Sequence, residues 1–128
     1  MNSRYTYDPN YPEIDAEQLQ QSMALACDWL INRAQVKTEQ HTVGLNTKGF
    51  DYENWQGAIR GEYVAASQTW DFFCPVWHTG QAVKALVMAY RLTGQAEWLE
   101  AAKLGGAFLL NQQIIDPDDP DYGFIYGY

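Results

Sequence analysis

The segment Gln68–His78 gathers, within a short stretch, the side chains that carbohydrate chemistry requires. It holds the carboxylate of Asp71, the imidazole of His78 and the indoles of Trp70 and Trp77. Flat aromatic faces pack on the apolar faces of sugar rings, and polar side chains bind the hydroxyl groups. A helix is expected to follow, and a helix N-terminus favours an anionic group such as a uronate carboxylate. The segment therefore predicts a carbohydrate site, with Trp70 and Trp77 as stacking platforms.

Asp71 is the strongest candidate for acid or base chemistry. Trp70 and Phe72 flank it, and partial desolvation of a carboxyl group raises its pKa toward the value that a general acid needs near neutrality. The alternative is that Asp71 caps a turn or pairs with Arg60. For His78, the choice lies between binding substrate or serving as a base, and being held by a backbone carbonyl at the start of the helix.

A hydrolase needs a second carboxyl group, because glycoside hydrolysis uses one on each side of the sugar. Asp51 and Glu53 offer that group, although nothing in the sequence places Asp51 opposite Asp71, and a solvated turn is the alternative. Three further residues are expected to bind substrate, namely Trp55, Tyr63 and Gln81. Core packing is the alternative for the two aromatic ones, as it is for Trp70 and Trp77.

The composition predicts one small globular domain. The chain has 128 residues, 47% of them hydrophobic and 19% charged, and a formal net charge of −8. This charge argues against partners that require a basic face, namely nucleic acids and anionic membranes. No apolar run approaches the length of a membrane span. Residues Met1–Tyr5 lack the order of a signal peptide, which favours a cytoplasmic location; a periplasmic or secreted one would mean that a signal had been removed.

No cofactor and no metal are expected. The sequence contains neither a phosphate-cradling glycine loop nor a dinucleotide-binding fingerprint. His41 and His78 have no zinc-ligand spacing to each other or to Cys27 and Cys74, which we expect to be free thiols. The acidic run 116–121 lacks the spacing of a calcium loop and reads as a solvated turn.

Three helices are predicted. Asp15 and Gln18 have the spacing of a capping box, and an apolar stripe continues from there to about residue 35. The run 81–92 is apolar nearly all round, which indicates burial on most sides, and it ends at Gly94. A third helix begins at about Ala96 and ends near Gln113, with a glycine pair, 105–106, that implies close approach of a neighbouring backbone. Residues 37–69 are expected to be irregular.

An internal repeat accompanies these helices. The segments 28–32 and 107–111 share an aromatic-aliphatic-aliphatic-Asn ending, and each is followed by Gly-Phe-x-Tyr, at 49–52 and at 123–126. Repeated helical pairs indicate stacked hairpins that bury their apolar faces only against their neighbours. Because the second unit stops at Tyr128, where its buried helix should start, we expect the chain to be a fragment.

These features resemble the six-hairpin glycosidase superfamily of (α/α)6 toroids, in which inner helices line a cleft and outer helices surround them. The resemblance is carried by Pro75–Ala82, Ala89–Gly94, Glu97–Ala102 and Phe108–Gln112. It implies an all-α fold of antiparallel helical hairpins, with residues 1–14 as an irregular lead-in and 15–128 as about one and a half hairpins of an incomplete toroid. It also implies substrate contacts from the loops that enter the inner helices. In the unsaturated uronyl hydrolases of this superfamily an Asp near a Trp performs the acid/base step, a role that would fall here on Asp71.

The expected function is that of a carbohydrate-active enzyme fragment. The favoured reaction is hydrolysis of a glycan or a uronic-acid-containing oligosaccharide, with Asp71 and Asp51 as the catalytic carboxylates. A sugar epimerase of the same fold is the enzymatic alternative, and a helical-repeat scaffold that binds without turnover is the non-catalytic one. If the chain is complete, self-association through exposed helix faces is expected.

Overall fold

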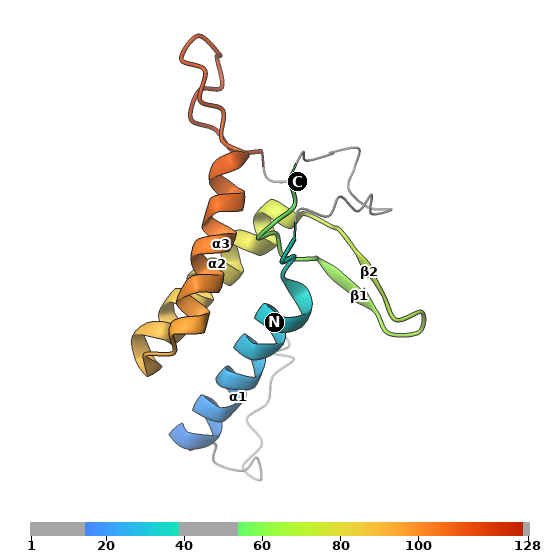
Figure 1. Cartoon of the computed structure of the whole chain (residues 1–128), viewed down its shortest axis with the longest axis vertical. Helices are drawn as coiled ribbons and strands as arrows, with labels where there is room; N and C mark the ends of the chain where they lie inside the picture. The colour runs from blue at the N-terminus through green and yellow to red at the C-terminus, as the bar shows by residue number, and fades with distance from the viewer. Residues whose placement is uncertain (1–14, 39–53, 127–128) are drawn as a thin grey trace, which may run out of the picture.

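The computed structural model describes residues 15–38 and 54–126, and these are mostly helical (Figure 1). Helix α1 (Ala16–Trp29) continues into a π-helical turn, η1 (Leu30–Ala34), and is followed by a short antiparallel hairpin, β1 (Glu62–Val64) and β2 (Thr69–Asp71). Helices α2 (Pro75–Thr93) and α3 (Ala96–Asn111) complete the order. The predicted lead-in 1–14, the Gly-Phe-x-Tyr segment 49–52 and Asp51 lie outside the described residues. The mostly helical character agrees with the expected fold class. The short β-hairpin is an addition to it and corrects the expectation that the segment is irregular up to residue 69.

Helix α1 begins where its capping box predicts. The Asp15 carboxylate accepts from the Gln18 backbone N–H at 2.8 Å, and the Gln18 side chain accepts from the Asp15 N–H at 3.3 Å. These two bonds satisfy backbone donors that a helix start leaves without intrahelical partners. The helical path, including η1, ends at Ala34, which confirms the predicted end near residue 35.

Helix α2 begins at Pro75, six residues before the predicted start at Gln81. Proline lacks an N–H, which the first turn of a helix does not need, and its fixed φ already suits a helix. Cys74 precedes it in a left-handed conformation with φ +45°, so the chain turns sharply into the helix. Trp77 and His78 therefore belong to the first turn of α2 rather than to a preceding loop.

Helices α2 and α3 run antiparallel and pack closely, joined across Gly94 and Gln95 (Figure 1). The cluster between them and the C-terminal part of α1 is apolar, and its buried members are Cys27, Ile31, Leu86, Ala89, Trp98, Ala101 and Ala102. Trp98 also donates its indole N–H to Asp28 at 3.0 Å, which ties α3 to α1. The start and end of α3 agree with the prediction.

The prediction that α2 is buried on most sides is wrong for the described structure. Leu86 and Ala89 face the core, but Met88 is 55% exposed and Leu92 is 75% exposed. The reason is that, among the described helices, only α1 and α3 pack against α2, and both meet it at the side that carries Leu86 and Ala89.

The glycine pair in α3 has two different surroundings. A Cβ on Gly105 would lie 2.8 Å from the Val83 Cγ2 and 3.2 Å from the Thr79 Cγ2, so helix α2 leaves no room for a side chain there. Gly106 has no such neighbour within 4 Å. Close approach of α2 therefore explains Gly105 but not Gly106.

A turn at residues 55–59 covers the end of η1, and we call it, together with Gln35 and Val36, the first glycine turn. The Val36 N–H donates to the Ala58 carbonyl at 2.9 Å, and the Gly57 N–H donates to the Val36 carbonyl at 2.9 Å. The Ala58 N–H closes the turn on the Trp55 carbonyl at 3.0 Å. The buried Gln35 side chain donates to the Gly57 carbonyl at 3.3 Å.

The same turn occurs again after α3, at residues 113–114 and 121–125, which we call the second glycine turn. The Ile114 N–H donates to the Phe124 carbonyl at 3.0 Å, and the Gly123 N–H donates to the Ile114 carbonyl at 2.7 Å. The Phe124 N–H closes on the Asp121 carbonyl at 2.9 Å. The Gln113 side chain donates to the Gly123 carbonyl at 2.8 Å, so each bond of the first turn has a counterpart here.

These bonds define the structural register of the repeat. Gly57 corresponds to Gly123, with φ values of +90° and +85°. The structural counterpart of the segment 123–126 is therefore 57–60, not the segment 49–52 that the sequence pattern suggests. One residue more separates Asn32 from Gln35 than separates Asn111 from Gln113, and the π-helical turn accommodates this extra residue.

Thr79 connects the first glycine turn to α2. Its hydroxyl is fully buried, accepts from the Ile59 N–H at 2.8 Å and donates to the Pro75 carbonyl at 2.6 Å. Thr79→Val keeps the shape but leaves the Ile59 N–H buried without this acceptor, so we expect the free energy of unfolding to fall by about 2 kcal/mol. Urea unfolding followed by circular dichroism measures this loss. Thr93→Val is the matched control, since the half-exposed Thr93 makes the same kind of bond to Ala89; an equal loss in both variants would contradict the prediction.

Candidate functional site

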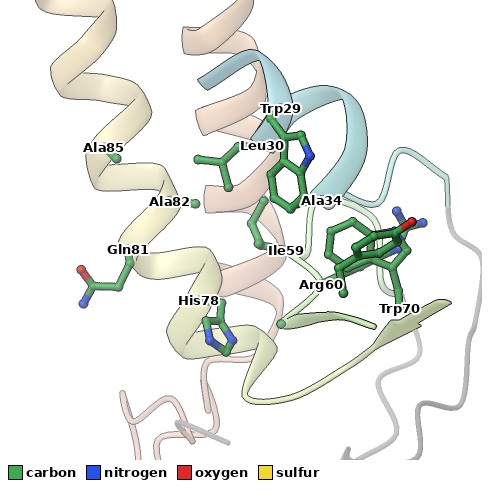
Figure 2. A pocket seen from close by; sticks show the side chains of 12 residues that line it. Trp29, Leu30, Ala34, Ile59, Arg60, Trp70, His78, Gln81, Ala82 and Ala85 are labelled. Carbon is green, nitrogen blue, oxygen red and sulfur yellow. The ribbon is translucent and has the colours of Figure 1, made fainter. Parts of the chain in front are cut away.

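A pocket of about 340 Å³ lies where η1, the first glycine turn, the β-hairpin and the first turns of α2 meet (Figure 2). Figure 2 shows Trp70 and Arg60 on one side of it and His78 and Gln81, from α2, on the other. The pocket is lined by Trp29, Leu30, Ala34, Ile59, Arg60, Gly61, Tyr63, Trp70, His78, Gln81, Ala82 and Ala85. It is therefore apolar with a few polar groups at its edges, which is the usual character of a small-molecule site.

Trp70 is the centre of an aromatic cluster in this pocket. Tyr63 is its direct cross-strand partner, with ring centroids 5.0 Å apart, and Trp29 approaches from the end of α1 with centroids 5.5 Å apart. Both pairs are tilted, an arrangement that aromatic rings favour. The cluster forms because residues from two distant parts of the chain meet at the hairpin.

Arg60 adds a positive charge to the same cluster. Its guanidinium carbon lies 5.8 Å from the Trp70 ring centroid, within the range of a cation–π contact. Its Nη1 donates to the Arg33 carbonyl at 2.9 Å, which fixes its direction. Burial lowers the pKa of Arg60 from its ordinary value, but a guanidinium stays charged at neutral pH.

A second pocket, of about 460 Å³, adjoins the first and shares Trp29, Tyr63 and Trp70 with it. Its other lining residues are Arg33 and Gln68. The aromatic cluster thus separates two hollows, each with an arginine, in a chain whose net charge is −8. Positive charge beside both hollows is compatible with an anionic ligand there.

His78 is held by a backbone carbonyl, as one of its two sequence interpretations predicts. Its Nδ1 lies 2.6 Å from the Phe73 carbonyl oxygen, so the assigned tautomer carries the proton on Nδ1 and leaves Nε2 as an acceptor. The His78 ring and the Phe73 carbonyl also leave little space for a side chain at Gly61. A Cβ there would meet the Phe73 carbonyl and lie 3.1 Å from the His78 Cε1. His78 still lines the pocket and can accept a hydrogen bond from a ligand hydroxyl.

The candidate substrate-binding residues divide between the pocket and other places. Trp70, Tyr63, His78 and Gln81 line it, while Trp77 does not. Trp77 is 59% exposed on α2 and makes a T-shaped ring contact with His78 at a centroid distance of 5.1 Å, so it is not a core residue. Trp55, which is also predicted to bind substrate, is a core residue.

Trp55 has no exposed face for a sugar, which corrects the expectation that it stacks on substrate. Its exposed fraction is 0%, and it packs edge-on against Phe72 with centroids 4.5 Å apart. Val36, Ala58 and Phe108 belong to the same buried cluster. Core packing, the alternative interpretation, holds for this residue.

The structure does not bring Asp71 into the pocket. In the hairpin register Asp71 faces Glu62, and Trp70 faces Tyr63. Since successive side chains of a strand point to opposite faces, the two carboxylates lie on the face of the hairpin opposite to the aromatic pair. Asp71 is half-buried and does not line either of the two hollows. Asp51, the second predicted catalytic residue, lies outside the described residues.

Sequence reasoning missed two residues of the site. Trp29 falls on the apolar stripe of α1 and reads as core, yet it is 47% exposed and lines both hollows. Arg60 reads only as a partner for Asp71. Neither residue carries a local signal, because their role depends on contact with Trp70, which is distant in the sequence.

In the part of the chain that the structure describes, neither the thiols nor the metal-ligating side chains form a second site. Both cysteines are free, as predicted; Cys27 is buried, and burial together with the nearby Asp28 raises the pKa of its thiol. Within residues 15–38 and 54–126, no group of three or more His, Cys, Asp or Glu side chains is arranged to hold a metal ion. None of the described helices has the length and apolarity to cross a membrane.

Comparisons with known proteins give no identification. The chain matches no protein-family model, and searches of curated proteins and of solved structures return no significant match.

Proposed function

We propose that this chain binds an acidic carbohydrate in the pocket beside Trp70. The observation that carries the proposal is the contact of Trp70 with both an arginine and two further aromatic rings, at the edge of a hollow of about 340 Å³. A sugar ring stacks on an indole through its C–H face, and a uronate carboxylate pairs with a guanidinium. Gln81 and His78, across the pocket, supply partners for hydroxyl groups.

The choice of an acidic sugar depends on Arg60 and Arg33. The whole sequence contains eight Lys and Arg residues against sixteen Asp and Glu. Two arginines that converge on one aromatic cluster are therefore a local exception to the charge of the protein. Arg60 is also partly desolvated, which strengthens its attraction for an anion relative to that of a fully exposed cation.

Charge recognition by Arg60 is tested with a matched pair of ligands. We expect Arg60→Gln to weaken binding of a glucuronate oligosaccharide by about tenfold, since a partly desolvated charge-assisted pair is worth roughly 1.4 kcal/mol. Binding of the corresponding glucose oligosaccharide should change by less than about twofold. Quenching of tryptophan fluorescence during titration measures both affinities. Arg60→Lys, which keeps the charge, is the control; equal losses for the acidic and the neutral ligand would contradict a role in charge recognition.

We further propose, from the sequence resemblance, that the helical repeat is of the (α/α) toroid type and that the wider activity is carbohydrate processing. For hydrolysis by Asp71 the hairpin register is unfavourable, because a sugar stacked on Trp70 would have the Asp71 carboxylate on the other side of the sheet. Binding at the pocket is therefore the function that the geometry supports best. Product analysis with unsaturated uronate oligosaccharides, using the wild type and Asp71→Asn, tests directly whether Asp71 catalyses hydrolysis. Turnover that is lost in Asp71→Asn would support hydrolysis, and isomerised sugar would favour the epimerase alternative.

A further inference from the structure

The two glycine turns differ in what covers them. In the first, α3 lies directly on the turn: a Cβ on Gly57 would collide with the Leu104 carbonyl. The Gln35 side chain, besides its bond to Gly57, donates to the Ala101 carbonyl of α3 at 2.8 Å. Ala58 belongs to the same buried cluster as Phe108 of α3, and its exposed fraction is 0%. Helix α3 thus packs directly on the first glycine turn.

The second turn has the same backbone without that cover. A Cβ on Gly123 would meet nothing within 4 Å. Phe124, the counterpart of the buried Ala58, is 54% exposed. Among the described residues, the Gln113 side-chain amide bonds only to Gly123, whereas Gln35 also bonds to a helix carbonyl. Figure 1 shows this turn extending beyond the end of α3, away from the other helices.

The adjoining face of α3 is open in the same way. Alignment of Asn32 with Asn111 pairs Ile31 with Leu110. Ile31 is 5% exposed in the cluster that includes α3, but Leu110 is 66% exposed. The second turn and the end of α3 therefore form one apolar surface, which we call the tail surface and define by Leu110, Ile114, Ile115, Gly123 and Phe124.

Helix α1 carries the matching half. The same alignment pairs the α3 residues that face the first turn, Ala101, Leu104 and Gly105, with Ser22, Leu25 and Ala26 of α1. All three α1 residues are exposed, Leu25 at 72%, although their α3 counterparts are buried or half-buried. Leu19, one turn earlier, is 57% exposed. We call these four residues the head surface.

We infer that the tail surface is a docking site for the head surface of a second copy of this chain. The contact would repeat the packing of α3 on the first glycine turn, with Gln113 donating to a backbone carbonyl of the incoming α1 near Ser22. Ala26 would take the place of Gly105, and a small side chain there allows close approach of the helix. A second copy is the occupant because the chain itself carries both halves of an interface that it already forms within its own fold.

Such an interface is heterologous, because the head surface of one copy contacts the tail surface of the next. Its assembly therefore continues from copy to copy, and blocking either surface alone stops it. This property separates it from a symmetric dimer, in which one patch meets the same patch of its partner.

The test uses two blocked variants and their mixture. Ala26→Arg blocks the head and Leu110→Arg blocks the tail; both positions are exposed on helices, and arginine suits a helix. By sedimentation velocity the wild type should self-associate with increasing concentration, and each variant alone should need at least about tenfold higher concentration to do so. Mixed together, the two variants should form a one-to-one dimer, because one intact head and one intact tail remain.

Met88→Arg is the control, since Met88 is similarly exposed, at 55%, but lies on α2 outside both surfaces. It should associate like the wild type, and circular dichroism should report the same helix content for every variant. A wild type that stays monomeric into the millimolar range would overturn the inference. So would a mixture of the two variants that stays monomeric, because that mixture keeps one intact head and one intact tail.

Discussion

Gly57→Ala should lower the free energy of unfolding by about 4 kcal/mol, the largest effect that we expect from a single methyl group in this chain. Two costs combine. An alanine held at φ +90° loses roughly 1 kcal/mol, and a Cβ that collides with the Leu104 carbonyl costs about 3 kcal/mol more, because a helix backbone must move to admit it. Urea unfolding monitored by circular dichroism gives the difference directly.

Gly123→Ala isolates the second cost, because the same turn recurs there. Its φ of +85° imposes nearly the same backbone strain, but a Cβ on Gly123 meets nothing within 4 Å. The loss should be only about 1 kcal/mol. Equal losses at Gly57 and Gly123 would mean that α3 does not rest on the first turn as described. Recovery of Gly123→Ala alone, with Gly57→Ala too unstable to purify, would already show that the substitution costs more stability at Gly57 than at Gly123.

Trp70→Ala should weaken binding of an acidic oligosaccharide by about a hundredfold. The substitution removes the stacking face itself and the ring that Tyr63, Trp29 and Arg60 pack against. An anchor of this kind is worth roughly 2–3 kcal/mol in binding. Since this variant removes one of the fluorescent indoles at the site, isothermal titration calorimetry is the appropriate measurement.

Trp77→Ala is the matched control for that experiment. Trp77 is also an exposed tryptophan of the same segment, but it does not line the pocket. Its removal should change the affinity by less than about threefold. If Trp77→Ala weakened binding as much as Trp70→Ala, the ligand would lie along the outer side of α2 rather than in the pocket between the hairpin and the helix.

The described helices were predictable because their signals are local. The Asp15–Gln18 capping box and Gly94 act within one turn of the chain, and α1 begins and α2 ends where these signals predict. The start of α2 was missed, although Pro75 is a known first-turn residue, since the preceding aromatic run reads as a loop. The β-hairpin was missed because each strand has only three residues, too few for a clear alternating pattern. It depends instead on Trp70, which packs against the buried cluster of Ala34, Ile59 and Ala82.

The site was only partly predictable, because it too depends on contacts between residues that are distant in the sequence. Trp70, Tyr63, His78 and Gln81 were selected from composition and spacing, and the structure places all four around one pocket. Composition could not distinguish them from Trp55, which has the same chemistry but lies in the core. Nor could it show that Asp71, adjacent to Trp70 in sequence, lies on the opposite face of the hairpin, because strand pairing determines that face.

The sequence by itself determined where α1 and α3 lie and where α2 ends, that the chain is acidic and rich in aromatic residues, and that a helical unit is repeated. These are properties of neighbouring residues and of composition. Only the tertiary structure decided the register of that repeat, because Gly57 and Gly123 are equivalent through their hydrogen bonds and not through the residues around them. It likewise decided which aromatic residues line the pocket, since burial depends on which distant segments pack together. The same packing leaves the second glycine turn exposed where the first one holds a helix.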